Sequence, residues 1–247
     1  MELTFFGHSC WGVSVGTHRI LIDPYPIGPN EEVLIRDFAR ACDVVLVTHG
    51  AADHLGIAID LLQAVPTTLL VSEPAVVYHA RSLGLDPTRA RVIAWNGQHS
   101  IGRWLVRAIE VRHASFFESH DGQVLSGMPL GFIVGHEDDD EVRVAHLGDT
   151  SLFSDLKLLG LLYRPTVALL GIGAATDFLA EMTPQEGALA ALWLGADLAL
   201  PMHYEADPSV ARDFCSAVKQ SPRAIRTWVP ETGMTCRIER STTITRL

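Results

Sequence analysis

The sequence predicts an α+β fold in which two β-sheets pack against each other and helices cover their outer faces. Hydrophobic residues make up 48% of the 247 residues and charged residues 19%, a composition typical of a chain with a well-filled core. Short apolar strands occur in both halves of the chain, with helices interspersed among them. Because no low-complexity linker or internal repeat divides the sequence, we expect residues 1–247 to form a single domain.

The first half begins with short strands and then alternates strands with helices. Turn residues bound each strand, and the apolar run of residues 44–47 is typical of a strand buried on both faces. The predicted strands are Leu3–Phe6, Trp11–Val15, Arg19–Asp23, Val44–Val47, Thr67–Val71, Val92–Ile101 and Trp104–Val111. The predicted helices are Ile57–Ala64 and Pro74–Leu83. The segment from His113 to Met128 lacks a clean period, and we expect a long loop there.

The second half repeats this alternation. We expect strands at Phe132–Val134, Val142–Leu147, Val167–Leu170 and Leu198–Pro201 and near Thr227 and Cys236, with helices at Ser151–Leu161, Thr183–Trp193 and Pro208–Lys219. The helix from Thr183 has the clearest start signal. Threonine can cap a helix, Pro184 suits the first helical position, and Glu186 can complete a capping box.

Histidines and aspartates follow several of the apolar strands. His49, Asp53 and His54 come after residues 44–47, and His113 follows residues 104–111. Asp149 follows residues 142–147, and His203 follows residues 198–201. Functional side chains often lie in the loops that follow strands, because the strands hold these loops in place. Imidazole and carboxylate groups together are suitable ligands for zinc, manganese or iron. A single histidine at a strand end is usually structural, but the recurrence predicts a metal site.

The ordered set His-x-x-x-Asp-His, His, Gly-Asp-Thr, His resembles the metallo-β-lactamase superfamily. More closely, the chain resembles the family of uncharacterised metal-dependent hydrolases related to ascorbate-6-phosphate lactonase. The matching stretches run nearly end to end; they include Phe6-Gly7-His8-Ser9-Cys10, Ile20-Leu21-Ile22-Asp23-Pro24, Asp53-His54-Leu55-Gly56, His146-Leu147-Gly148-Asp149-Thr150 and Pro201-Met202-His203-Tyr204. The resemblance implies a four-layer αββα sandwich with one metal cleft.

The resemblance also implies two metal positions. His49, the residue at 51 and His113 would form the first, and Asp53, His54 and His203 the second, with Asp149 between them. Residue 51, usually histidine in the family, is Ala51 here and cannot ligate a metal. We favour one zinc or manganese ion at the second position. Two ions, with water or His8 filling the gap, and an impaired site remain as alternatives.

The implied activity is hydrolysis of a small ester-like substrate, a lactone or a phosphodiester, through a metal-bound hydroxide. Asp53 would bind the metal and orient the water, and His8 is a second catalytic candidate, although a packing histidine at a turn explains it equally well. Asp23 and His146 are expected to orient ligands. The alternatives are a non-catalytic metal- or ligand-binding protein and a nuclease-type phosphodiesterase.

Charge and length limit the partners. The net charge is −10 and no Lys or Arg cluster stands out, so we expect a small-molecule substrate and neither nucleic acid nor membrane binding. With no signal peptide or membrane span recognised, the expected location is the cytoplasm. The resemblance adds a homo-oligomer as a possible state.

Overall fold

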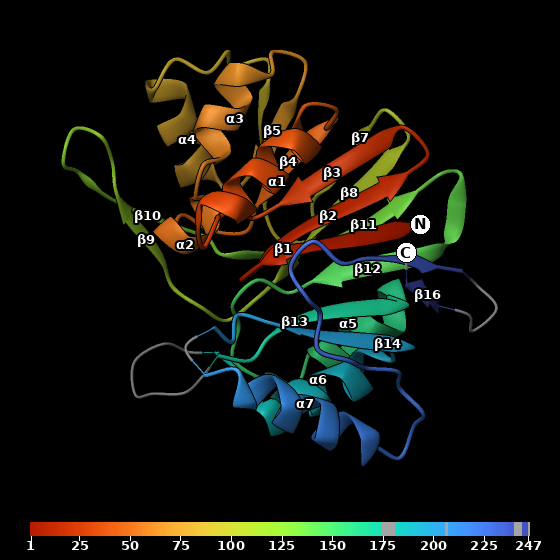
Figure 1. Cartoon of the computed structure of the whole chain (residues 1–247). Helices are drawn as coiled ribbons and strands as arrows, with labels where there is room; N and C mark the ends of the chain where they lie inside the picture. Colours follow the sequence, from red (N-terminus) through yellow and green to blue (C-terminus); the bar gives the residue numbers. More distant parts are fainter. Residues whose placement is uncertain (174–180, 206, 240–243, 247) are drawn as a thin grey trace.

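The computed structural model describes residues 1–173, 181–205, 207–239 and 244–246, and two large β-sheets form its centre (Figure 1). The first sheet has eight strands in the order β16-β15-β1-β2-β3-β4-β5-β6. They are β1 (Glu2–Gly7), β2 (Cys10–Val15), β3 (His18–Ile22), β4 (Val44–Val47), β5 (Leu69–Ser72), β6 (Ala90–Val92), β15 (Thr235–Ile238) and β16 (Ile244–Arg246). Strands β3 to β6 run parallel. The helices between them are α1 (Pro29–Ala39), the short α2 (Ala52–Leu55), α3 (Ala58–Ala64) and α4 (Pro74–Ser82).

The second sheet has six strands in the order β14-β13-β12-β11-β8-β7. They are β7 (Gln98–Ile101), β8 (Trp104–Glu110), β11 (Leu130–His136), β12 (Asp139–His146), β13 (Val167–Gly171) and β14 (Leu198–Met202). Strands β12, β13 and β14 run parallel. The helices α5 (Leu156–Tyr163), α6 (Pro184–Leu194) and α7 (Ser209–Lys219) belong to this half of the molecule.

Three apolar clusters separate four layers. Between the sheets, side chains such as Trp11 and Phe132 form one cluster. A second joins the first sheet to α1, α3 and α4, for example through Val45 and Leu62. The third joins the second sheet to α5, α6 and α7, around residues such as Leu170. Figure 1 shows these helices on the outer faces. The structure thus confirms the predicted αββα sandwich.

Strand β4 shows why its sequence is apolar without alternation. Val44 and Leu46 point into the cluster between the sheets, whereas Val45 and Val47 point into the cluster under the helices. All four side chains are fully buried. A strand that is covered on both faces has no polar side. Because β4 is covered in this way, it ends inside the core, and the residues that follow it are tightly packed.

Two local predictions are wrong. The expected loop from His113 to Met128 contains a hairpin of β9 (Ser115–Glu118) and β10 (Val124–Gly127), which lies outside both large sheets. Its strands are largely exposed, so no regular apolar period marks them. The helix expected from Ser151 begins only at Leu156. The Ser151 amide donates to the Arg112 carbonyl and the Thr150 hydroxyl accepts from the Arg112 amide, and these bonds hold the chain out of helical geometry.

Two smaller differences concern strands. Residues 92–101 do not form one strand, because β6 belongs to the first sheet and β7 to the second. Near Thr227 the described residues form only an isolated bridge, between Leu198 and Arg226. Among the helices that the structure describes, none has the length and apolar character needed to cross a bilayer.

The predicted start of α6 is confirmed. The Thr183 side chain accepts a hydrogen bond from the Glu186 amide, and the Glu186 carboxylate accepts one from the Thr183 amide at 2.9 Å. Gly195 ends the helix in the left-handed conformation, with φ of 70°. Both ends of the helix therefore follow from local sequence.

We expect Thr183→Ala to lower the free energy of unfolding by about 1 kcal/mol, because the substitution leaves an amide at the helix start without its cap. Urea denaturation followed by circular dichroism measures the change. The exposed Thr67 offers a matched control, and Thr67→Ala should leave the midpoint nearly unchanged. Equal effects of the two substitutions would contradict the capping role.

Candidate metal centre

The histidines and aspartates singled out in the sequence converge at one edge of the sandwich. His8 follows β1, and His49 follows β4 by two residues in the same sheet. Asp149 and His203 come after the parallel strands β12 and β14 of the other sheet. Since parallel strands end at a common edge, both sheets deliver their polar side chains to one place.

Asp149 lies at the middle of this cluster, and its side chain is only 4% exposed. Its Oδ2 atom is surrounded by the Nε2 atoms of imidazoles. The distances are 3.1 Å to His54, 3.5 Å to His203, 3.8 Å to His113 and 3.9 Å to His49. Contact with histidines of both groups is the arrangement expected of a carboxylate between two metal positions.

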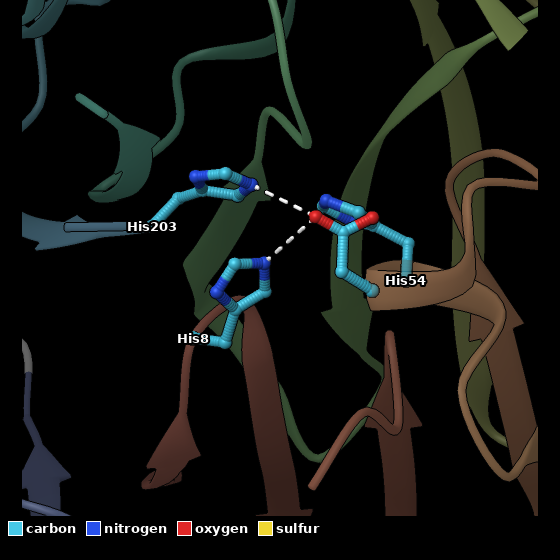
Figure 2. Close-up of side chains that lie close together, drawn as sticks. His8, His54 and His203 are labelled. Carbon is cyan, nitrogen blue, oxygen red and sulfur yellow. Dashed lines mark hydrogen bonds and ion pairs between the residues drawn. The ribbon is translucent and has the colours of Figure 1, made fainter. Parts of the chain in front are cut away.

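The second position brings together Asp53, His54 and His203, with His8 beside them (Figure 2). One atom from each of these residues lies within 4.8 Å of the others. The Asp53 Oδ2 atom is 3.4 Å from the His203 Nε2 atom and 3.3 Å from the His8 Nε2 atom. The three predicted second-position residues are therefore close enough to share one cation.

The first position offers fewer ligand side chains than the second. Ligand atoms of His49, His113 and Asp149 lie within 4.8 Å of one another. Ala51, at the start of α2, adds only a methyl group. His8 groups with the second position, so it does not stand in for the side chain missing at residue 51.

The cluster fits a divalent cation. Among the residues that the structure describes, the Nε2 atoms of His49, His54 and His203 and the Oδ1 atom of Asp149 are buried without a hydrogen-bond partner. Buried polar atoms are normally paired, because leaving them unpaired costs free energy. Imidazole nitrogens and carboxylate oxygens are suitable ligands for zinc and manganese. A cation at the second position would partner the atoms of His54, Asp149 and His203, whereas the His49 atom belongs to the first position.

Asp23 fixes the orientation of His54. Its Oδ2 atom accepts hydrogen bonds from the His54 Nδ1 atom at 2.8 Å and from the Thr48 hydroxyl at 2.8 Å, and its Oδ1 atom accepts one from the Thr48 amide at 2.7 Å. The His54 Nε2 atom is thereby directed at Asp149. His146 instead donates to the Ser9 carbonyl at 2.8 Å and so contacts the backbone.

Burial and neighbouring charges set the protonation of the centre. Burial, and after it the neighbouring His54, lowers the pKa of His49 to about 3, so this imidazole is neutral near pH 7, as a ligand must be. Burial alone would lower the pKa of His203, but the carboxylates of Asp149 and Asp53 outweigh it and raise that pKa to about 9. The positive charge of protonated imidazole thus balances the negative charge of the buried carboxylates. A bound cation would supply this positive charge instead.

Sequence reasoning missed two carboxylates. The Glu205 carboxylate accepts hydrogen bonds from the His8 amide at 2.7 Å and the His8 Nδ1 atom at 2.9 Å. Glu181 is buried, and its Oε2 atom is 3.3 Å from the His203 Nδ1 atom. Burial, and then the charge of Asp149, raise the pKa of Glu181 to about 7. Glu205 lies two residues after His203, which was the available signal, but no motif marks Glu181.

Three residues around the centre have left-handed backbone conformations. The φ angles are 51° for His8, 48° for Asp23 and 59° for His203. Such conformations are costly for residues other than glycine and persist where the surrounding structure enforces them. A hydrogen bond of 3.1 Å from the His203 amide to the His8 carbonyl joins two of these turns. The backbone thus holds both imidazoles at the second position.

The chain is similar to known proteins over most of its length. The family model described as the Beta-lactamase superfamily domain matches residues 18–204. A metal-dependent hydrolase of Methanoculleus marisnigri is 34% identical over 217 residues, which are 87% of this chain and 85% of the relative. Another from Methanospirillum hungatei is 31% identical and covers 97% of this chain and 100% of its own length. The solved structure of a metallo hydrolase from Ignicoccus hospitalis has a TM-score of 0.75 at 26% identity, covering 95% of this chain and 96% of that one.

We expect Asp23→Asn to lower the affinity for Zn²⁺ roughly 10–100-fold, because His54 would lose the carboxylate that orients its ring. Competition with a chromophoric chelator measures the affinity. Asp213→Asn on the exposed side of α7 is the control, and circular dichroism checks that both variants fold. Unchanged zinc affinity in folded Asp23→Asn protein would contradict the role of Asp23.

Proposed function

This chain belongs to the beta-lactamase superfamily and is a metal-dependent hydrolase, and from that premise we propose that it cleaves a small ester-like substrate, a lactone or a phosphodiester. One observation carries the proposal. Buried imidazole nitrogens without hydrogen-bond partners, among the described residues, meet around the carboxylate of Asp149. A chain selected only for folding would bury apolar side chains at this point instead.

We propose that a single zinc or manganese ion is held by Asp53, His54, Asp149 and His203. Ligand atoms of Asp53, His54 and His203 lie within 4.8 Å of one another, and the Asp149 Oδ2 atom is 3.1 Å from His54 and 3.5 Å from His203. Ala51 leaves the first position with His49, His113 and a share of Asp149. Zinc in catalytic sites keeps a coordination position open for water or substrate and can expand to about five ligands, so four protein ligands still leave one position. The exposed fraction of the Asp53 side chain, 39%, leaves that position accessible to water and substrate.

When held by these residues, a divalent cation would lower the pKa of a bound water and would polarise the oxygen of the bond to be cleaved. Asp53 orients the attacking water by accepting a hydrogen bond from it. His8 is placed to move the proton, because its Nε2 atom is 3.3 Å from the Asp53 Oδ2 atom. Glu205 holds the Nδ1 atom of His8 and so fixes the direction of the ring. The proton taken by His8 at Nε2 is then available to the leaving oxygen.

Ala51 also supports a second candidate, a metal- or ligand-binding protein without catalysis. Metal content and turnover distinguish the two. The hydrolase requires both a bound cation and cleavage of some member of a panel of esters, lactones and phosphodiesters. A purified protein that binds no zinc or manganese under supplementation and cleaves none of these compounds would overturn the hydrolase proposal.

We expect the purified protein to hold about one cation per chain and the Ala51→His variant about two, because a third side chain would complete the first position. Elemental analysis after dialysis measures the ratio. Asp149→Ala should reduce the metal content and abolish turnover. About two cations in the unaltered protein would show that the first position is sufficient without residue 51.

We expect His8→Ala to lower kcat about 10²–10⁴-fold while the metal content stays the same, because the variant loses a proton carrier but none of the four proposed ligands. Glu205→Gln should show a smaller loss, since the His8 ring remains. The control is His18→Ala, near Asp43 and away from the centre. Loss of the metal in His8→Ala would instead make His8 a ligand.

A further inference from the structure

We propose that the cavity beside Ala51 takes the apolar acyl group of a neutral carboxylic ester or lactone. This inference rests on the proposed hydrolase function and narrows its substrate class. The cavity has a volume of about 610 Å³, within the range of pockets that hold small molecules. Its walls include Ala51, Leu55, His113, Phe116, Phe117 and Val124.

The cavity is continuous with the metal centre through His113. This residue lines the cavity, and its Nε2 atom is 3.8 Å from the Asp149 Oδ2 atom. The wall also includes Ala51 and Ala52, which follow His49 by two and three residues in the sequence. Methyl groups therefore form this part of the wall. A group bound in the cavity can reach the reacting bond without crossing a polar barrier.

The lining favours a neutral molecule. Neither Lys nor Arg contributes to these walls in the part of the chain that the structure describes, and the charged side chain among them is the carboxylate of Glu118. A phosphodiester bound here would bring its negative charge next to the carboxylate of Glu118. No Lys or Arg side chain among the described wall residues would offset the repulsion. An acyl chain instead replaces water on apolar surface, which is favourable.

The β9–β10 hairpin supplies the outer wall and is anchored at its base. The Ser115 hydroxyl accepts a hydrogen bond from the Gly50 amide at 3.2 Å and donates one to Glu73 at 3.3 Å. The Phe117 ring packs on Gly50 so closely that a Cβ atom there would overlap it. Figure 1 shows the hairpin extending from the body of the molecule beside α2. These contacts fix the hairpin relative to Gly50, the residue that follows His49 of the metal centre.

Farther along the hairpin, large apolar side chains are exposed. Phe116 is 57% exposed and Val124 is 74% exposed, although both line the cavity. A bound acyl chain would cover part of this surface. His8 gives the direction of the substrate, because it groups with Asp53 and His203 rather than with His113. The leaving alcohol faces His8, and the acyl group therefore faces the cavity.

The reaction balances without any further reactant. Water adds to the carbonyl carbon, and the bond from that carbon to the alcohol oxygen breaks. The proton that the water loses passes through His8 to the alcohol oxygen. The products are a carboxylic acid, ionised near pH 7, and an alcohol.

The test compares 4-nitrophenyl acetate, butyrate and hexanoate, with bis(4-nitrophenyl) phosphate as the anionic substrate. For the metal-loaded protein, kcat/KM should rise about 10-fold for every two methylene groups added to the acyl chain. Phe116→Asp and Val124→Asp should each lower the ratio of hexanoate to acetate kcat/KM about 10-fold. Leu161→Asp, at an apolar position of α5 that is 69% exposed, is the matched control and should leave the ratio unchanged.

A binding measurement separates this inference from the proposed activity. The neutral ketone 2-octanone should bind the metal-free protein in ligand-observed NMR, and Phe116→Asp should weaken that binding. If 2-octanone binds in this way but no ester, lactone or phosphodiester is cleaved, the hydrolase proposal fails while the ligand class of the cavity stands. Ester cleavage that is independent of acyl length and of Phe116, or a preference for the phosphodiester, would overturn the inference. In a series of alkyl acetates, the alcohol group is lengthened instead of the acyl group. If kcat/KM increases along that series and not along the acyl series, the proposed orientation of the substrate is reversed.

Discussion

The structure depends on one buried charge, the carboxylate of Asp149. It is almost inaccessible to water, and its Oδ2 atom lies 3.1–3.9 Å from imidazoles delivered by both sheets. An isolated carboxylate at this depth would be very costly, so the fold requires compensating positive charge, from the surrounding histidines or from a cation that they would bind. Gly148 makes the approach possible, because its φ of 53° turns the chain at a point where Thr48 of the other sheet leaves little room for a side chain.

The positions of the central residues could be predicted because they follow from strand burial. Val44 to Val47 alternate between two apolar clusters, and such a run must end in the interior of the sandwich. The first polar residues after it, including His49 and His54, have no route to bulk water and need partners. The same reasoning applies to Asp149 after β12. Periodicity and the chemistry of the following residues therefore predicted a metal site and two packed sheets with helices outside, whereas the assignment of ligands to two metal positions came from the family resemblance.

The remaining contacts could not be predicted because they depend on turn geometry. Glu205 reaches His8 only because the backbone turns at His203 with a φ of 59°, and the sequence does not specify that turn. The β9–β10 hairpin pairs its strands with each other and not with either large sheet, so its exposed faces carry no regular apolar signal. The late start of α5 has a similar origin. Hydrogen bonds from residues 150 and 151 to Arg112, distant in sequence, prevail over local helix propensity.

Ala51 connects the number of metal ions to the kind of substrate. A histidine at this position would point a ring nitrogen at the first position and would place a polar ring in the wall of the cavity. Alanine removes the ligand and at the same time leaves a methyl group facing Leu55 and the phenylalanines of the hairpin. The loss of the ligand and the apolar surface of the wall arise from the same side chain, so any substitution at residue 51 changes both together. In the proposed reaction, the loss of the first metal position is tolerated because the space beside Ala51 would bind the acyl group of the ester that a cation at the second position would cleave.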